Sequence, residues 1–339
     1  MGYLKLKLGI AALYALTLLP LCAAAAESSA VSVIHSTFHG WKSIIIRNST
    51  AEVVIVPDIG RVMQFNLADK AGPFWLNPAF DKDMPADIEG WKNFGGDKAW
   101  PAPQVDWPKV AGRGWPPPTG FDAAPFTASI KATAEGPLVQ LVSPVDPNYG
   151  VRIQRTISLD WRKPVLKIKT TYKKVRGAPV RIGIWTITQL AAPDRAFILL
   201  PPRSRFLCGY TNLPPAPHDL KIEGRLLSLS RDPANKVKIG SDGESLLWVG
   251  SGADLLIERK TDASDSKRES SPLDWPELGS HSQIYTGPGN EMKYIEFELL
   301  DRLRDLKPRQ ETSFEAVYTL IPRTESNPDA EARKIFRQP

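Results

Sequence analysis

The sequence of 339 residues predicts an all-β protein, built as a large antiparallel sandwich. Short segments rich in β-branched and aromatic residues alternate apolar with polar positions, which is the two-residue period of a strand. Proline and glycine separate these segments and form the expected turns. Helical periodicity is confined to residues 329–336 near the C-terminus, so neither a helical nor an α/β fold is expected.

The expected strands begin with a hairpin. Residues 52–56 form its first strand, which Pro57, Asp58 and Gly60 terminate, and residues 62–67 form its second strand. The other expected strands are 43–47, 138–142, 151–159, 165–172, 180–189, 246–250, 255–259, 292–299 and 313–321.

The N-terminus has the pattern of a secretory signal peptide. Lys5 and Lys7 precede an apolar run over residues 8–19, and four alanines at 23–26 precede Glu27. We therefore expect residues 1–26 to be removed and the mature protein to be periplasmic or secreted, without stable membrane insertion. An uncleaved anchor and a lipoprotein signal are the alternatives. The run is short for a bilayer span, and Leu21 precedes Cys22 where lipoprotein signals carry a small residue.

Residues 30–323 are expected to form one domain, followed by a C-terminal tail at 324–339. After cleavage Cys208 is the remaining cysteine, and we expect a small buried apolar residue there rather than a nucleophile. The formal charge falls from +6 to +4 when Lys5 and Lys7 are removed, and no basic stripe remains, which argues against nucleic acid as a partner. The sequence does not predict an oligomeric state.

Residues 91–125 differ from the rest of the chain because they are rich in tryptophan and proline. Since proline fixes φ and removes a donor, this segment is expected to be a long, stiff loop without strand or helix. Long ordered loops in compact domains are often functional. The residues concerned are Trp91, Trp100, Trp107, Trp115, Pro101, Pro103, Pro108, Pro116, Pro117, Pro118 and Pro125.

This segment carries a family resemblance. Residues 93–104, read as NFGGDKAWPAPQ, followed by Trp107, resemble a bacterial domain family of unassigned function within the galactose-mutarotase-like (aldose 1-epimerase-like) superfamily. The resemblance covers roughly residues 40–322. It is supported by segments similar to an opening hairpin (53–61), a central strand (185–189) and a closing hairpin (294–298 with 306–308).

The resemblance implies a large antiparallel supersandwich with a sugar site in the concave face of one sheet. Better-known relatives interconvert the anomers of aldoses, and others are domains of glycan-cleaving enzymes.

Strand parity provides candidate binding residues in the middle of the chain. Arg155 interrupts the apolar face of residues 151–159, so it either forms a buried ion pair or lines a cavity. Trp185 and Gln189 share one face of the central strand and would offer a sugar a stacking plane and an amide. The alternative is a core tryptophan beside a solvent-facing glutamine.

The aromatic segment adds Lys98, Trp100, Gln104 and Trp107 as candidate binders, with Arg61 beyond the first hairpin turn. The alternatives are that the aromatic residues only cap one end of the sandwich and that Arg61 is an exposed strand residue.

Glu296 is the candidate catalytic base. It shares a strand face with Tyr294 and Glu298, and the resemblance implies a base on a late strand of this kind, so Glu296 is preferred over Glu291. An ordinary exposed carboxylate is the alternative. Familiar mutarotases take their acid from a histidine in the central strand, where this chain has Trp185, which argues against epimerase activity. The histidines have no metal-ligand spacing, so neither metal nor cofactor is expected; they are His35, His39, His218 and His281.

Three functional hypotheses follow. The preferred one is an exported carbohydrate-binding protein whose partner is a saccharide or glycan. The second is a carbohydrate-modifying enzyme, an epimerase or a polysaccharide lyase-like protein, that uses Glu296. The third is an envelope interaction or scaffold protein, against which the aromatic segment argues.

Overall fold

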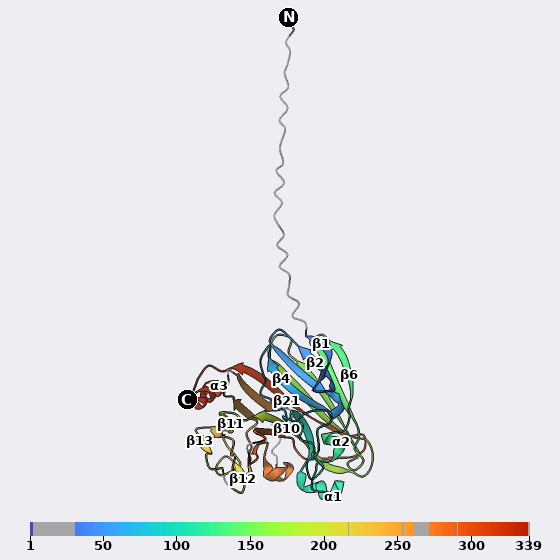
Figure 1. The fold of residues 1–339 in the computed structure, drawn as a ribbon, viewed down its shortest axis with the longest axis vertical. Coiled ribbons are helices and arrows are strands. Elements are labelled where there is room, and N and C mark those ends of the chain that lie inside the picture. Colours follow the sequence, from blue (N-terminus) through green and yellow to red (C-terminus); the bar gives the residue numbers. More distant parts are fainter. Residues whose placement is uncertain (3–30, 216, 253, 261–270, 290, 338–339) are drawn as a thin grey trace.

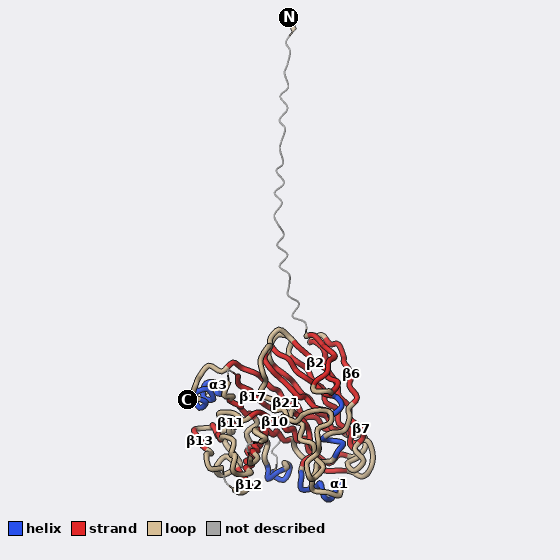
Figure 2. Tube along the Cα trace, viewed as in Figure 1, coloured by secondary structure: helices blue, strands red, loops and turns tan. Residues whose placement is uncertain are grey.

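The chain folds as two large antiparallel β-sheets packed face to face (Figure 1). The computed structural model describes residues 1–2, 31–215, 217–252, 254–260, 271–289 and 291–337. Strands make up most of the fold, and the helices are short and peripheral (Figure 2). The predicted antiparallel β-sandwich is therefore confirmed. Most of the predicted signal peptide lies outside the described residues.

The first sheet, which we call the large sheet, contains eleven strands within the described residues. One of them, β20, pairs with the start of β10 rather than extending the main order. In spatial order the strands are β1 (Ser32–Phe38), β2 (Trp41–Arg47), β3 (Ala51–Val56), β4 (Arg61–Leu67), β5 (Asp97–Ala102), β10 (Val180–Ala191), β19 (Tyr294–Leu300), β18 (Ser282–Thr286), β15 (Val237–Ser241) and β12 (Thr211–Leu213), with β20 at Arg304–Leu306.

The second sheet contains ten strands within the same described ranges. In spatial order they are β13 (Lys221–Glu223), β14 (Leu226–Leu229), β11 (Arg195–Leu199), β16 (Ser245–Val249), β17 (Asp254–Lys260), β21 (Glu311–Pro322), β9 (Val165–Lys174), β8 (Val151–Leu159), β7 (Gly136–Val145) and β6 (Thr127–Thr133).

The helices are short, and the longest packs on the second sheet. Helix α3 (Pro328–Phe336) lies within residues 324–339, which the sequence analysis assigned to a C-terminal tail. The side chain of its N-cap residue, Asn327, accepts hydrogen bonds from two backbone amides of the first turn. Its Ala332 and Phe336 pack with Phe197 and Leu247. None of the helices in the described residues combines the length and apolar character needed to cross a bilayer. The others are η1 (Pro57–Ile59), η2 (Gln104–Asp106), α1 (Trp107–Ala111), α2 (Thr119–Asp122), η3 (Pro272–Asp274) and η4 (Glu277–Gly279).

Every strand expected from the alternation is present, and the main core fills the space between the sheets. Strand β8 shows the pattern most clearly, because its buried positions alternate with more exposed ones over all nine residues. Burial of such apolar faces is the main stabilising contribution to a sandwich of this kind.

Three expectations were wrong. The aromatic segment is not free of regular structure, because it contains β5 with Pro101 inside it. Strand β5 pairs with β4 only at Asp97, so Pro101, which has no N–H to donate, interrupts no hydrogen bonds between these two strands. The expected closing hairpin does not form, because β19 and β20 each pair with β10. Cys208 is exposed rather than buried, in the segment between β11 and β12.

A polar cluster lies between the two sheets. Arg155 on β8 forms an ion pair with the Asp97 carboxylate and donates to the backbone oxygen of Gly60 at 3.1 Å. The hydroxyls of Tyr318 and Thr188 donate to Asp97 Oδ2 at 2.7 and 3.0 Å. These contacts connect the two sheets through one carboxylate.

Glu258 is buried beside this cluster, opposite Tyr318 in the β17–β21 ladder. Burial, and to a smaller extent the charge of Asp97, raise the pKa of the Glu258 carboxyl well above its ordinary value of 4.5. The folded protein therefore binds a proton at Glu258 that the unfolded chain releases as the pH rises above 4.5.

We expect Glu258→Gln to change how stability depends on pH. Because the folded-state pKa is raised, the wild-type carboxyl contributes its full stability below pH 4.5 and loses it as the pH rises through the folded value. Glutamine cannot ionise, so the melting temperature of the variant relative to wild type should increase with pH. Thermal melts across the pH range test this, with Glu311→Gln at the exposed start of β21 as the control. Parallel pH profiles for Glu258→Gln and wild type would contradict it.

Candidate functional site

The candidate site lies on the outer face of the large sheet, by which we mean the face turned away from the second sheet. Residues paired across neighbouring strands share a face, so the strand register shows which side chains lie together there. They form two adjacent rows that cross the strands. The first row is Leu213, Lys238, Tyr285, Glu296 and Gln189; the second is Thr211, Gly240, Gln283, Glu298, Ile187 and Lys98.

Glu296 forms the first polar group of the site. Gln189 Nε2 donates to Glu296 Oε1 at 3.0 Å, and Lys98 Nζ lies 3.6 Å from the same oxygen. Lys98 is 1% exposed. Burial lowers the pKa of the Lys98 amine to about 8, although the charge of Glu296 opposes the change. The amine therefore titrates close to physiological pH.

Glu298 forms the second polar group. Trp185 Nε1 donates to Glu298 Oε2 at 2.8 Å, and Lys238 Nζ lies 3.0 Å from the same oxygen and 4.6 Å from the Trp185 ring centroid. Burial raises the pKa of the Glu298 carboxyl to about 7; Lys238 opposes the rise and Glu296 adds to it. The Glu298 carboxyl therefore keeps its proton to a higher pH than an exposed glutamate does.

Tyr294 and Trp75 form an aromatic wall beside Glu296. Their ring centroids are 4.6 Å apart, and Asn93 Nδ2 donates to the Tyr294 hydroxyl at 3.3 Å. Tyr294 is half-buried, and burial raises the pKa of its hydroxyl above 10.0, so it remains protonated. Trp75 is 7% exposed, so the apolar surface that this wall offers beside the hydrogen-bonding groups is mainly the half-buried ring of Tyr294.

Several buried polar atoms on this face find no hydrogen-bond partner within the described residues. Buried polar groups are normally satisfied, so a concentration of unsatisfied ones in one place indicates a site for water or a ligand. The atoms are Lys98 Nζ, Gln189 Oε1, Asn93 Oδ1 and Gln283 Oε1. In contrast, the described residues contain no cluster of three potential metal-ligating side chains.

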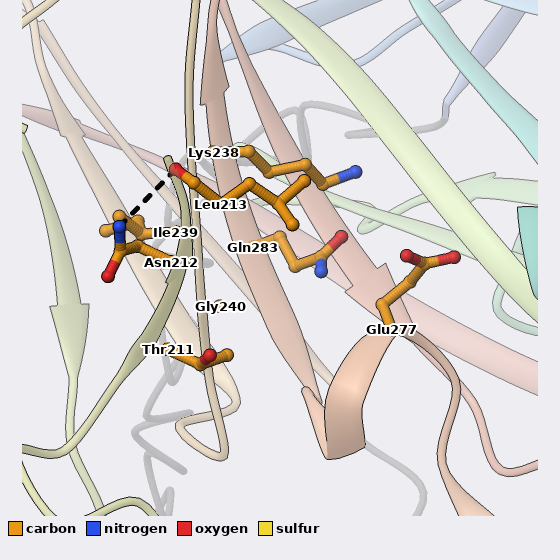
Figure 3. Close-up of a pocket in the computed structure, with 8 residues that line it drawn as sticks. All are labelled: Thr211, Asn212, Leu213, Lys238, Ile239, Gly240, Glu277 and Gln283. Atoms are coloured by element: carbon orange, nitrogen blue, oxygen red, sulfur yellow. Dashed lines mark hydrogen bonds between the residues drawn. The ribbon is translucent and has the colours of Figure 1, made fainter. Parts of the chain in front are cut away.

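A small cavity of about 40 Å³ opens at the β12 end of this face. The side chains of Lys238, Gln283 and Glu277 extend toward one another there (Figure 3). Gln104 does not line the cavity, and its backbone N–H donates to Glu277 Oε1 at 3.2 Å. A volume of about 40 Å³ has room for one or two water molecules or a group of similar size, and it is too small for a sugar ring.

Five of the residues proposed from the sequence lie together on the outer face. They are Lys98, Trp100, Trp185, Gln189 and Glu296. Trp100 packs edge to face on Trp185 at 5.5 Å between ring centroids, and its indole donates to Asp122 Oδ1 at 2.8 Å.

Three other proposed residues are not placed to contact a ligand. Arg155 lies between the sheets, paired with Asp97, which is the ion-pair alternative. Arg61 is fully buried and donates to Asp122 Oδ1 at 2.6 Å, and Trp107 is fully buried with its indole donating to the Pro101 carbonyl at 2.8 Å. Arg61 and Trp107 therefore support the aromatic segment from beneath and are not placed to contact a ligand.

Sequence reasoning assigned no role to Glu298, Lys238 or Gln283. Glu298 was already on the face shared with Glu296, so the parity that selected one carboxylate also indicated the other. Lys238 and Gln283 lie on the short strands β15 and β18, where apolar residues alternate with polar ones over only five positions. That weak alternation was the available signal.

Comparison with known proteins shows a galactose mutarotase-like fold. No family model matches the chain, and no curated protein matches it in sequence. A galactose mutarotase-like protein from Lactobacillus casei ATCC 334 aligns with a TM-score of 0.55 and 11% identity, over 82% of this chain and 100% of that one. A putative aldose 1-epimerase from Escherichia coli K12 aligns with a TM-score of 0.53 and 10% identity, over 81% and 97%.

A larger protein contains a similar fold. A TPR-domain containing protein from Parabacteroides distasonis ATCC 8503 aligns with a TM-score of 0.57 and 13% identity, over 84% of this chain. The chain spans about half of that protein, 48% of its length. Similarity at these identities establishes the shared fold.

We expect the charges around Glu298 to control its titration. Glu296→Gln removes a neighbouring negative charge and should lower the Glu298 pKa from its value of about 7, whereas Lys238→Met removes the compensating positive charge and should raise it. NMR titration of the side-chain carboxyl carbons measures both changes. Glu311→Gln serves as the control and should leave the midpoint in place. A Glu298 midpoint that neither site variant moves would show that the three side chains do not interact as described.

Proposed function

We propose that this protein binds a saccharide on the outer face of the large sheet, beside Glu296 and Tyr294. The observation that carries the proposal is the group of buried, unsatisfied polar atoms next to an aromatic wall: Lys98 Nζ, Gln189 Oε1 and Asn93 Oδ1. A sugar needs both features, because its C–H face packs on aromatic rings while its hydroxyls donate and accept hydrogen bonds. Glu296 adds a charged acceptor at the centre of the group.

The fold and the N-terminal sequence support the same proposal. Similar structures are described as galactose mutarotase-like and as a putative aldose 1-epimerase, and both descriptions refer to sugars. The signal-like residues 1–26 support export to the periplasm or the medium. An exported saccharide-binding protein satisfies both observations.

A glycan array followed by calorimetry on the bound glycans tests the proposal. Glu296→Gln should weaken binding roughly tenfold to a hundredfold, because a hydrogen bond to a charged group contributes about 1.5–3 kcal/mol. Glu311→Gln, on the second sheet, should bind like wild type. If no glycan binds, or if the two variants bind equally well, the site is not where we place it.

A second candidate function is acid–base chemistry on the bound sugar. Glu298, with a pKa of about 7, favours it because mutarotation needs a base at the anomeric hydroxyl and an acid at the ring oxygen. Glu296 and Glu298 are two residues apart on one strand face, roughly 7 Å along the strand. A protonated Glu298 would then replace the strand histidine of familiar mutarotases, and Glu296 would serve as base.

We expect this chemistry to be slow for free aldoses. Glu298 is 1% exposed, and its Oε2 already contacts Trp185 and Lys238, so the carboxyl is not free to approach a ring oxygen. Polarimetry of freshly dissolved glucose, galactose and uronic acids should show equilibration near the buffer rate. Rapid equilibration that is abolished both by Glu296→Gln and by Glu298→Gln would instead establish an epimerase that uses two carboxylates.

A further inference from the structure

We infer that the ligand is an uncharged oligosaccharide, which lies across the strands from Glu296 to the edge strand β12. This inference rests on the proposed function and specifies its ligand. It follows from the length of the polar rows, from one unsatisfied side chain at their far end, and from the pairing of lysines with glutamates along them.

The accessible part of the outer face is longer than one sugar ring. From β19 through β18 and β15 to β12 there are three strand spacings, or roughly 14 Å. Tyr285, Lys238 and Thr211 are half-buried along this path, and Leu213 at its end is 50% exposed. On the opposite side of Glu296 the row ends in buried Gln189, so a ligand can extend only toward β12.

Gln283 marks a second binding position on this path. It is 5% exposed, its Oε1 has no hydrogen-bond partner within the described residues, and it lines the small cavity with Lys238 and Glu277 (Figure 3). A cavity of about 40 Å³ admits a hydroxyl or hydroxymethyl group and excludes the ring that carries it. A sugar ring lying above Tyr285 and Lys238 would place such a group there.

The lysines Lys98 and Lys238 on the path each have a glutamate partner. Lys98 is paired with Glu296, and Lys238 is paired with Glu298. One further lysine, Lys236, has its amine 5.7 Å from the Tyr285 ring centroid, and one further carboxylate, Glu277, lines the cavity. An anionic glycan would therefore gain little net attraction, whereas the hydroxyls of an uncharged glycan match alternating donors and acceptors.

Calorimetry with sugar series of increasing length tests the inference. The probes are glucose, mannose and galactose, their β-1,4-linked di-, tri- and tetrasaccharides, and oligogalacturonates of equal length. The variants are Glu296→Gln at the first position and Gln283→Leu at the second, with Thr211→Val as an independent change on the edge strand. Gln154→Leu, on β8 of the second sheet, is the matched control, and circular dichroism melts confirm that each variant folds.

We expect the affinity for the preferred neutral series to rise about tenfold from monosaccharide to tetrasaccharide. Gln283→Leu and Thr211→Val should remove most of this gain while affecting the monosaccharide much less, and Glu296→Gln should weaken ligands of every length.

The other outcomes separate the inference from the proposed function. If the monosaccharide binds as tightly as the tetrasaccharide and Gln283→Leu has no effect, the extended site is wrong but saccharide binding stands. Tighter binding of oligogalacturonates than of neutral chains of equal length would overturn the uncharged ligand. If none of the probes binds, the proposed function fails and the inference fails with it.

Discussion

The contact between Arg155 and Asp97 is the interaction on which the arrangement of the two sheets depends. It joins β8 of the second sheet to β5 of the large sheet, and Tyr318 and Thr188 complete the coordination of the same carboxylate. Removing one member of a buried ion pair typically costs about 3–5 kcal/mol, because the other charge is left uncompensated. Since successive side chains of a strand alternate faces, fixing Asp97 between the sheets directs Lys98 to the outer face.

The outer face in turn depends on β10. This strand pairs with β5 on one side and with β19 on the other, so Ile187 lies between Lys98 and Glu298 and Gln189 lies opposite Glu296. Burying two lysines and two glutamates is costly unless each is paired, and here each lysine contacts one glutamate. Two buried atoms of this group, Lys98 Nζ and Gln189 Oε1, remain without a hydrogen-bond partner among the described residues and are therefore available to a ligand.

The aromatic segment is held against the site by Asp122 and by the close approach of the chain at Gly95. Asp122 accepts from the side chains of Trp91 and Trp100 in the same segment and from Arg61 on β4. Gly95 has a φ of 92°, and a Cβ atom there would lie 2.3 Å from the Trp75 carbonyl oxygen. Only glycine allows the chain to approach so closely before β5 begins.

The strands and their parity could be predicted from local patterns along the chain, because a strand shows itself by alternation. This alternation identified β8 residue for residue and placed Glu296 and Glu298 on one face. Tertiary structure decided which face of each strand meets the other sheet. Arg155 and Glu296 both lie within alternating strands, yet Arg155 packs between the sheets and Glu296 faces outward, because their partners come from distant segments. The positions of Lys238 and Gln283 beside Glu298 could not be predicted either. Their strands β15 and β18 are short, and only pairing with each other and with β19 places them in the sheet.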